Sequence, residues 1–270
     1  MKPFLSWAGN KYSVIGQISA LMPKGERFID VFCGSGAVFM NVKFDKYLVA
    51  DMNEDLIFLF QEVKRNPVAF TSISRALFDN FKGQDGYHKV RKMFNQKDQS
   101  GITTIKAAQM LYLNKHCYNG LFRRNLKGLL NSPYGHREKV YFPEKEMMGF
   151  HTIAPLCEFY CWGYESTLAQ AGMGDVVYCD PPYAKKPDAA MFTQYSGAAW
   201  GMTEQLKLLE RCMQAHERGA KIVISNSDSE EIISLYRSAG FLIHMIPTRR
   251  KIAAASSSRA KVMDILAIKE

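Results

Sequence analysis

Four short apolar runs, each followed by a polar or glycine-rich turn, constrain the fold of this chain more than any other feature. They lie within residues 26–42, 46–53, 174–183 and 220–229. Segments with the apolar spacing of helices lie between or after these runs. Short strands that alternate with helices predict an α/β fold with a doubly wound, mostly parallel sheet.

The end and the middle of the chain differ from this alternation. Residues 241–247 and 262–270 have the pattern of a terminal β-hairpin around a basic loop. Residues 56–145 contain helical segments followed by long stretches rich in Gly, Asn and Arg. We therefore predict one domain formed by residues 1–55 and 146–270, into which residues 56–145 are inserted as a mainly helical domain.

One predicted helix, residues 203–218, has a cap and an apolar face that can be named from the sequence. Thr203 stands where a side chain can cap the first turn. Four apolar residues have the spacing of one buried face: Leu206, Leu209, Cys212 and Met213. We expect this helix to pack on the sheet through that face.

The positive charge of the chain is confined to one segment. The net charge is +9, and residues 82–139 alone contain twelve Lys and Arg against three acidic residues, an excess of the same size. A one-sided excess of this kind favours a polyanionic partner, and nucleic acid is the usual one. A solvated basic face is the alternative interpretation.

Nothing in the sequence indicates a membrane protein, a secreted protein or a metal site. No apolar run approaches the roughly 20 residues that span a bilayer, and the N-terminus lacks the apolar region of a signal peptide. The six cysteines are scattered, so we expect reduced thiols. Cys157 and Cys161 are close together, but no second Cys/His pair at zinc spacing accompanies them. We expect a cytoplasmic protein without a bound metal or an obligate protein partner.

The first apolar run ends in a glycine turn that indicates a nucleotide-like cofactor. Gly34 and Gly36 form a G-x-G pattern before helix-compatible residues, but Phe39 occupies the third small position of a dinucleotide fingerprint, so NAD is disfavoured. Asp51 ends the next strand where a ribose-binding acid belongs, and Asp30 adds a second carboxylate. An adenosine compound without a pyrophosphate fits this pattern. S-adenosylmethionine is such a compound, and its sulfonium cation is stabilised by nearby carboxylates.

The third apolar run ends in the sequence Asp180-Pro181-Pro182-Tyr183, which can supply two hydrogen-bond acceptors and an aromatic ring. Proline lacks an N–H and ends sheet pairing, so the chain leaves the sheet in a stiff turn. The carboxylate of Asp180 and the carbonyl of Pro181 can accept from both N–H bonds of an exocyclic amine, which localises the nitrogen lone pair. Tyr183 offers a face on which a flipped base can stack. These features favour methyl transfer to a base amine, whereas a simple strand terminator is the structural alternative.

Taken together, the motifs resemble those of the Dam-type DNA adenine-N6 methyltransferases, the D12 class, in their α-class order. The similar stretches cover essentially the whole chain: FLSWAGNK, DVFCGSGAVFMN, LVADMNEDLI, LYLNKHCYNGLFRRNLKG, NSPYG, YFPE, VVYCDPPYA and ISNSDS. The resemblance implies a Rossmann-like S-adenosylmethionine-dependent catalytic domain with an inserted target-recognition domain. It implies methylation of adenine N6 in double-stranded DNA, within GATC, after the base flips into the DPPY site.

The resemblance also implies roles for individual residues. The catalytic residues would be Asp180, Pro181, Pro182 and Tyr183. The S-adenosylmethionine pocket would contain Trp7, Lys11, Asp30, Phe32, Gly34, Gly36, Asp51 and Asp180. The DNA-binding residues would be Arg91, Tyr118, Asn119, Leu121, Arg123, Arg124, Pro133, His136 and Arg137. Among these, Arg123 would contact a guanine, and Arg91 would lie along the DNA backbone.

Four residues depart from the family pattern. Asn10 replaces a glycine of WAGGK, Ser6 stands where a lysine is common, and Asp30 stands where many relatives have glutamate. Arg137 stands where relatives often place an aromatic residue that enters the duplex. The planar guanidinium of Arg137 could fill the gap beside a flipped adenine.

Methylation of an RNA adenine or a protein glutamine is the alternative activity, and a catalytically silent DNA-binding module is the alternative class. The expected location is the cytoplasm of a bacterial or phage-infected cell, on the nucleoid.

Overall fold

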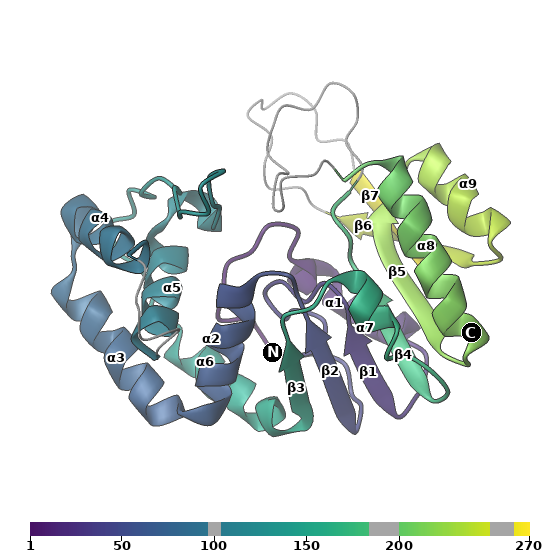
Figure 1. Cartoon of the computed structure of the whole chain (residues 1–270), viewed down its shortest axis with the longest axis horizontal. Coiled ribbons are helices and arrows are strands. Elements are labelled where there is room, and N and C mark those ends of the chain that lie inside the picture. Colours follow the sequence, from purple (N-terminus) through teal and green to yellow (C-terminus); the bar gives the residue numbers. More distant parts are fainter. Residues whose placement is uncertain (97–103, 184–199, 249–261) are drawn as a thin grey trace.

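The computed structural model describes residues 1–96, 104–183, 200–248 and 262–270, and these form one seven-stranded sheet (Figure 1). The strand order is β3-β2-β1-β4-β5-β7-β6. Their bounds are β1 (Arg27–Asp30), β2 (Lys46–Ala50), β3 (Cys157–Tyr160), β4 (Asp175–Cys179), β5 (Lys221–Ser227), β6 (Leu242–Thr248) and β7 (Val262–Lys269). Strands β1 to β5 all run parallel to one another, and β7 is antiparallel to both of its neighbours, β5 and β6. The predicted mostly parallel sheet with a terminal hairpin is confirmed, and the basic loop of that hairpin lies outside the described residues.

Helices cover both faces of the sheet. They are α1 (Ile15–Leu21), α2 (Glu54–Arg65), α3 (Pro67–Asn80), α4 (Gly83–Phe94), α5 (Thr104–His116), α6 (Glu144–Ile153), α7 (Tyr164–Leu168), α8 (Met202–Glu217) and α9 (Glu230–Ser238). The 3-10 turns in the described residues are η1 (Lys11–Val14), η2 (Tyr118–Gly120) and η3 (Ala154–Leu156). Within the part of the chain that the structure describes, no helix has the length and apolar content to cross a membrane.

Alternate residues of each strand enter two separate cores, which is the physical basis of the doubly wound arrangement. In β4, Val176 and Tyr178 pack into the core that includes α1, α2, α5 and α6, whereas Val177 and Cys179 pack into the core under α7, α8 and α9. Successive side chains of a strand point to opposite faces, so a strand buried on both sides is apolar throughout. This explains why the central strands appear in the sequence as unbroken apolar runs.

The inserted region begins as a helical bundle beside the β3 edge of the sheet (Figure 1). Helix α5 contacts α2, α3 and α4, and all of its residues from Ala107 to Asn114 are buried. Residues 117–143 then follow as loops, joined by the isolated bridges Cys117–Tyr134 and Arg124–Leu130. Helix α2 contacts both α5 and β3. The division at residues 56 and 145 therefore stays a prediction, because α2 belongs to a core shared by both parts.

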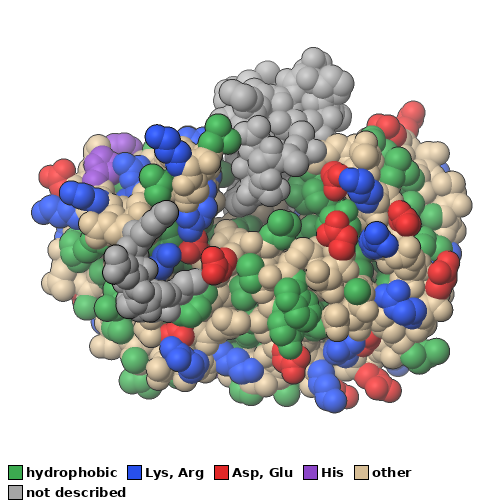
Figure 2. All heavy atoms as spheres, viewed as in Figure 1, with side chains coloured by type: hydrophobic (Ala, Val, Ile, Leu, Met, Phe, Trp, Pro, Cys, Tyr) green, Lys and Arg blue, Asp and Glu red, His purple; other side chains and the backbone are tan. Residues whose placement is uncertain are grey.

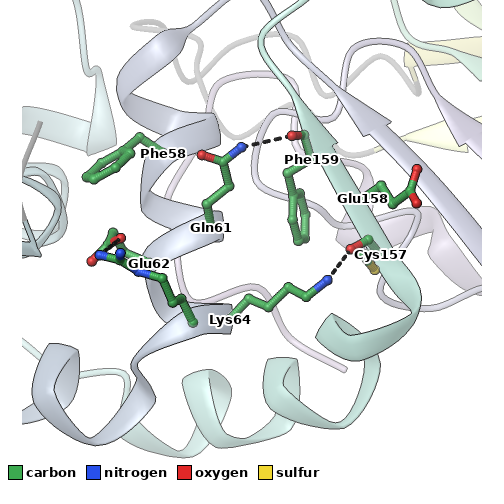
Figure 3. Close-up of a pocket in the computed structure, with 8 residues that line it drawn as sticks. Phe58, Gln61, Glu62, Lys64, Cys157, Glu158 and Phe159 are labelled. Carbon is green, nitrogen blue, oxygen red and sulfur yellow. Dashed lines mark hydrogen bonds and ion pairs between the residues drawn. The ribbon is translucent and has the colours of Figure 1, made fainter.

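Strand β3 was not predicted, and side chains of α2 cover its free edge (Figure 3). The amide of Gln61 donates to the Phe159 carbonyl at 2.9 Å, and the ammonium of Lys64 donates to the Cys157 carbonyl at 2.8 Å. Such contacts satisfy the backbone of an edge strand and prevent it from pairing with another chain. None of the predicted site residues lines the groove between α2 and β3, so we assign it no functional role.

Three details of the predicted helices are wrong. Residues 37–42 form turns instead of a helix, because the Asn41 amide donates to the Ala37 carbonyl at 2.8 Å and replaces the backbone bond there. Helix α8 begins at Met202 after Gly201, and Thr203 makes no cap hydrogen bond. Leu206 is 53% exposed. The buried face of α8 is formed instead by Gln205, Leu208, Leu209, Cys212 and Ala215.

Candidate active site

The carboxyl ends of three adjacent parallel strands bring the predicted acids together. Asp30 ends β1, Asp51 follows β2, and Asp180 follows β4, with β1 between the other two strands. In open α/β sheets this edge is where ligands bind. Burial, followed by the charges of Asp180 and Asp51, raises the pKa of Asp30 well above its usual value. Asp30 is therefore close enough to both Asp51 and Asp180 for their charges to act on it.

Lys11 supplies the cation for one of these acids. Its Nζ lies 2.7 Å from each carboxylate oxygen of Asp180 and 3.0 Å from the Gly9 carbonyl oxygen that accepts from it. The Lys11 side chain is only 8% exposed. Burial raises the pKa of Asp180, and the charge and hydrogen bond of Lys11 oppose that rise. The same ammonium lies 5.1 Å from the centre of the Tyr183 ring.

Two further contacts hold the DPPY segment. The Tyr183 hydroxyl donates to Oδ2 of Asp264 in β7 at 3.0 Å, and the Gln205 amide of α8 donates to the Pro182 carbonyl at 3.2 Å. Burial, followed by the charges of Asp180 and Asp264, raises the pKa of Tyr183 far above its ordinary value, so the phenol stays a donor. Three contacts from η1, α8 and β7 thus fix four consecutive residues. The residues after Tyr183, numbers 184–199, lie outside the described part.

The glycine turn after β1 holds Asp51 and contacts Trp7. Gly34 and Gly36 have φ angles of +47° and +80°, which glycine adopts readily. The Gly34 N–H donates to Oδ2 of Asp51 at 3.1 Å, and the Asn53 N–H donates to Oδ1 at 2.9 Å. Burial raises the pKa of Asp51, and these N–H groups oppose the rise. A Cβ at position 34 would lie 2.9 Å from Cδ1 of Trp7, so the indole packs directly on the turn.

An aromatic cluster adjoins the same edge of the sheet. The ring of Phe32 lies 6.2 Å from that of Tyr164 and 5.7 Å from that of Trp200, and Tyr164 and Trp200 are 5.7 Å apart. The sequence predicted Phe32 as a residue of the S-adenosylmethionine pocket, but it did not predict Tyr164 or Trp200 as site residues. Tyr164 begins the helix after the unpredicted strand β3, so its position could not be inferred from the sequence.

The predicted DNA-binding residues lie in the loops of the inserted region, except for Arg91 in α4, and most are exposed. The exposed ones are Tyr118, Asn119, Arg123, Arg124, Pro133, His136 and Arg137, whereas Leu121 and Arg91 are half-buried. Asn119 and His136 both have φ angles of +49°, a conformation that is uncommon for residues other than glycine. The loops are therefore held in specific, locally strained conformations.

Two of the predicted DNA-binding arginines contact the protein itself. Arg91 donates to the Ser132 carbonyl at 2.9 Å, and Arg124 forms an ion pair with the buried Asp55 of α2. The side chain of Arg123 has no partner among the described residues, although its backbone N–H donates to the Ser132 hydroxyl at 3.0 Å. Of the three, Arg123 is thus the arginine whose guanidinium is available to a ligand.

The N-terminal residues connect the loops of the inserted region to the glycine turn. The Asn114 side chain accepts from the Ser6 N–H at 2.9 Å and donates to the Ser6 carbonyl at 2.7 Å. Trp7, which packs on Gly34, also stacks on Phe122 with ring centres 6.2 Å apart. Segments that are more than a hundred residues apart in the sequence therefore meet at one place.

Comparison with known proteins shows which family this chain belongs to. A family model described as D12 class N6 adenine-specific DNA methyltransferase matches residues 7–252. The chain belongs to this family. It is 38% identical to the DNA adenine methylase of Serratia marcescens over 269 residues, which cover 99% of this chain and 98% of that protein. It is 36% identical to the DNA N-6-adenine-methyltransferase of Escherichia phage P1, covering 99% of this chain but only 35% of that protein.

A solved structure of a putative methyltransferase, yhhF from Escherichia coli, covers 96% of this methyltransferase and 84% of its own chain, at 12% identity and a TM-score of 0.35. The family and the sequence relatives make this protein an adenine-specific DNA methyltransferase. The RNA-adenine, glutamine and non-catalytic alternatives are therefore set aside. The family implies S-adenosylmethionine as the methyl donor.

The residues at the sheet edge fit that donor. Oδ1 of Asp30 is buried without a hydrogen-bond partner among the described residues, and Lys11 is bound to Asp180. Three buried carboxyl groups with the single ammonium of Lys11 bound to one of them favour a further cation, and S-adenosylmethionine carries one on its sulfur. Among the described residues, no group of three or more His, Cys, Asp or Glu side chains could bind a metal ion.

Proposed function

We propose that this methyltransferase modifies the adenine of GATC in double-stranded DNA after the base has flipped into the site formed by Asp180, Pro181, Pro182 and Tyr183. The observation that carries the proposal is the three-point fixation of this segment at the ligand-binding edge of the sheet. Preorganised acceptors and a positioned ring are what methyl transfer to a weakly nucleophilic amine needs. We also propose that the protein acts in the cytoplasm, on nucleoid DNA.

The chain's own residues perform distinct parts of this reaction. Asp180 and the Pro181 carbonyl each accept a hydrogen bond from the adenine N6 amino group, which draws the nitrogen lone pair out of the ring. Tyr183 stacks on the base and holds it in line. These groups provide orientation and electrostatic stabilisation without a covalent intermediate.

The cofactor side of the site supplies the electrophile. When bound, S-adenosylmethionine provides an activated methyl group on a sulfonium. Asp51 is oriented by two backbone N–H groups, and its remaining lone pairs would accept from the ribose hydroxyls of the cofactor. Trp7 and Phe32 provide apolar contacts, Gly34 and Gly36 allow the backbone to approach closely, and the carboxylates at the sheet edge offset the positive charge.

The exposed loops of residues 115–139 form the DNA-recognition surface in this proposal. Lys and Arg side chains gather over the α4 end of the molecule, where these loops lie (Figure 2). Such charges bind phosphates and add salt-dependent affinity. The contacts of Arg91 and Arg124 within the protein favour a second role for both, which is to hold the recognition loops in place. Arg137 stays our candidate for the residue that fills the gap beside a flipped adenine.

Mapping methylated adenines tests the proposed site and sequence. The protein would be expressed in cells that lack adenine methylation, and N6-methyladenine in their DNA would be located by methylation-sensitive sequencing. We expect N6-methyladenine at GATC sequences and little or none at adenines in other sequences. Methylation at a different sequence would contradict the GATC assignment while leaving the activity in place, and transfer to single-stranded but not duplex DNA would contradict base flipping.

Replacing Arg123 by alanine is expected to relax the preference for one guanine of the site. Arginine can donate to guanine O6 and N7 together, a contact that contributes about 1–3 kcal/mol of discrimination. The measurement is kcat/KM on duplexes that carry each single-base change. Lys127→Ala, on the same exposed loop, is the matched control and is expected to weaken all duplexes equally. An equal loss on all duplexes for Arg123→Ala would show that Arg123 contacts the phosphate backbone.

A further inference from the structure

A buried polar network lies directly behind the DPPY segment. It consists of Gln205 in α8, Asn226 in β5 and Tyr236 in α9, and none of these side chains is exposed to solvent. Asn226 belongs to the ISNSDS stretch, to which the proposed function assigns no role. Fully buried polar side chains are costly unless every donor and acceptor is satisfied. Their presence beneath the candidate site therefore requires an explanation.

The hydrogen bonds of the network set the direction of each side chain. The Ser227 N–H donates to Oδ1 of Asn226 at 2.8 Å, so the Asn226 amide nitrogen points the other way. That nitrogen donates to Oε1 of Gln205 at 3.0 Å and lies 3.0 Å from the Tyr236 hydroxyl oxygen. The Tyr236 hydroxyl donates to the same Oε1 at 3.2 Å. Two donors thus fix the oxygen of Gln205, and its nitrogen must face the Pro182 carbonyl.

The bond from Gln205 to Pro182 acts on the free torsion of the DPPY backbone. Peptide bonds are planar, the ring of Pro182 fixes φ of that residue, and a following proline restricts Pro181. Between the Pro181 carbonyl and the Tyr183 nitrogen, ψ of Pro182 is therefore the soft rotation that remains. The Pro182 carbonyl oxygen moves with this rotation. Its hydrogen bond to Gln205 at 3.2 Å holds the angle.

The flanking residues are fixed by separate contacts. Asp180 is bound by Lys11, and the Tyr183 hydroxyl is bound by Asp264. These contacts hold the two ends of the segment, whereas Gln205 holds its middle. The relative placement of the Pro181 carbonyl and the Tyr183 ring consequently depends on the Gln205 amide.

We propose that Gln205 is a positioning residue for methyl transfer, and that Asn226 acts through it by orienting its amide. Gln205 aligns the Pro181 carbonyl with the stacking face of Tyr183 before the adenine arrives. This inference rests on the proposed function, in which Asp180 to Tyr183 form the catalytic site. It assigns to the ISNSDS stretch the task of supporting the DPPY segment from behind.

The first test compares kcat for Gln205→Met and Tyr236→Phe. Gln205→Met removes the donor to Pro182 at similar volume, and we expect kcat to fall about tenfold or more, because small misplacements of reacting groups are costly. The KM for DNA and the Kd for S-adenosylmethionine should change little. Tyr236→Phe is the graded control, because it removes one of the two donors to Oε1 of Gln205 but keeps the Asn226–Gln205 and Gln205–Pro182 bonds. Since one donor still orients the amide, its kcat should fall much less than that of Gln205→Met, although its unfolding midpoint is lower.

The second test uses Asn226→Asp, which is isosteric and touches none of the DPPY residues. The new carboxylate cannot donate to Oε1 of Gln205 and attracts its amide nitrogen instead, so the amide turns away from Pro182. We expect a fall in kcat of similar size, and no further fall in the double variant with Gln205→Met, because both changes remove one contact. Additive losses in the double variant would overturn the proposal. An unchanged kcat for the isosteric variant would overturn it even if Gln205→Met did not fold.

Failure of this inference is distinguishable from failure of the proposed function. An inactive Asp180→Ala with an unchanged kcat for Gln205→Met and Asn226→Asp would leave the catalytic assignment intact and remove the positioning role. Equal losses of kcat in Gln205→Met and Tyr236→Phe would show that the network acts only through stability.

Discussion

Methyl transfer to duplex DNA should fall by about 10²-fold or more when Asp180 is replaced by alanine, because a preorganised acceptor at the reacting amine is lost. The carboxylate is fixed by Lys11 at 2.7 Å, so it does not need to reorganise when the adenine arrives. Transfer of tritium from labelled S-adenosylmethionine under saturating cofactor and DNA measures this loss. A kcat near the wild-type value would contradict the role of Asp180.

The fold must be tested separately in this variant, because alanine leaves the Lys11 ammonium without its carboxylate. The Lys11 side chain is 8% exposed, and removing one partner of such a buried pair can cost about 3–5 kcal/mol of folding free energy. Asp180→Asn is the matched variant, since its amide oxygen still accepts from Lys11. We expect the unfolding midpoint of Asp180→Asn to lie closer to the wild-type value than that of Asp180→Ala. Its kcat should lie between those of the wild type and Asp180→Ala. Equilibrium dialysis of the cofactor separates a loss of binding from a loss of chemistry.

The parts of the fold that could be predicted from sequence depend on local signals. Strands β1, β2, β4 and β5 each contain a short apolar run because both of their faces are buried. The end of α9 was also predictable, since Gly240 has a φ angle of +80° and closes the helix. Strand β3 escaped prediction because it has four residues and lies at the edge of the sheet, with Glu158 exposed.

The errors arise where a side chain acts on a distant or unexpected backbone group. Asn41 bonds to the Ala37 carbonyl and prevents the helix that the composition of residues 37–42 favours. In α8, the exposed Leu206 was expected inside and the buried Gln205 was not. Gln205 is buried because Asn226, 21 residues later, satisfies its amide. Propensity and periodicity contain no information on such pairs.

In the candidate site, too, some features follow from local sequence and others depend on contacts between distant residues. The acids at strand ends follow from the parallel sheet, since strands that run the same way end at one edge. Family resemblance supplied both Lys11 and Asp180 as site residues but not the ion pair between them, which joins positions 169 residues apart. Asp264, which holds Tyr183, lies in the last strand and has no motif of its own. Contacts across the sheet therefore had to come from the structure.

Replacing Lys11 by methionine is expected to move the acid limb of the pH–kcat profile to higher pH. Burial is the largest influence on Asp180 and raises its pKa, while Lys11 provides the opposing effects that lower it. Removing the ammonium therefore raises the pKa further, and at a given pH a larger fraction of the carboxyl group is protonated. A protonated carboxyl group is a poorer acceptor for the adenine amine, so we expect kcat to fall about tenfold or more at neutral pH and to recover partly as the pH rises.

The matched control is Lys11→Arg, which keeps a positive charge beside Asp180 and should leave the acid limb close to that of the wild type. Activity would be measured across the acid and neutral range for all three proteins, with cofactor binding checked at each pH because Lys11 is also one of the proposed cofactor-pocket residues. If the acid limb of Lys11→Met coincides with the wild-type limb while kcat falls equally at every pH, Lys11 acts by orienting Asp180 instead of by keeping it ionised. The shape of the profile thus separates the electrostatic role of the ammonium from its geometric role.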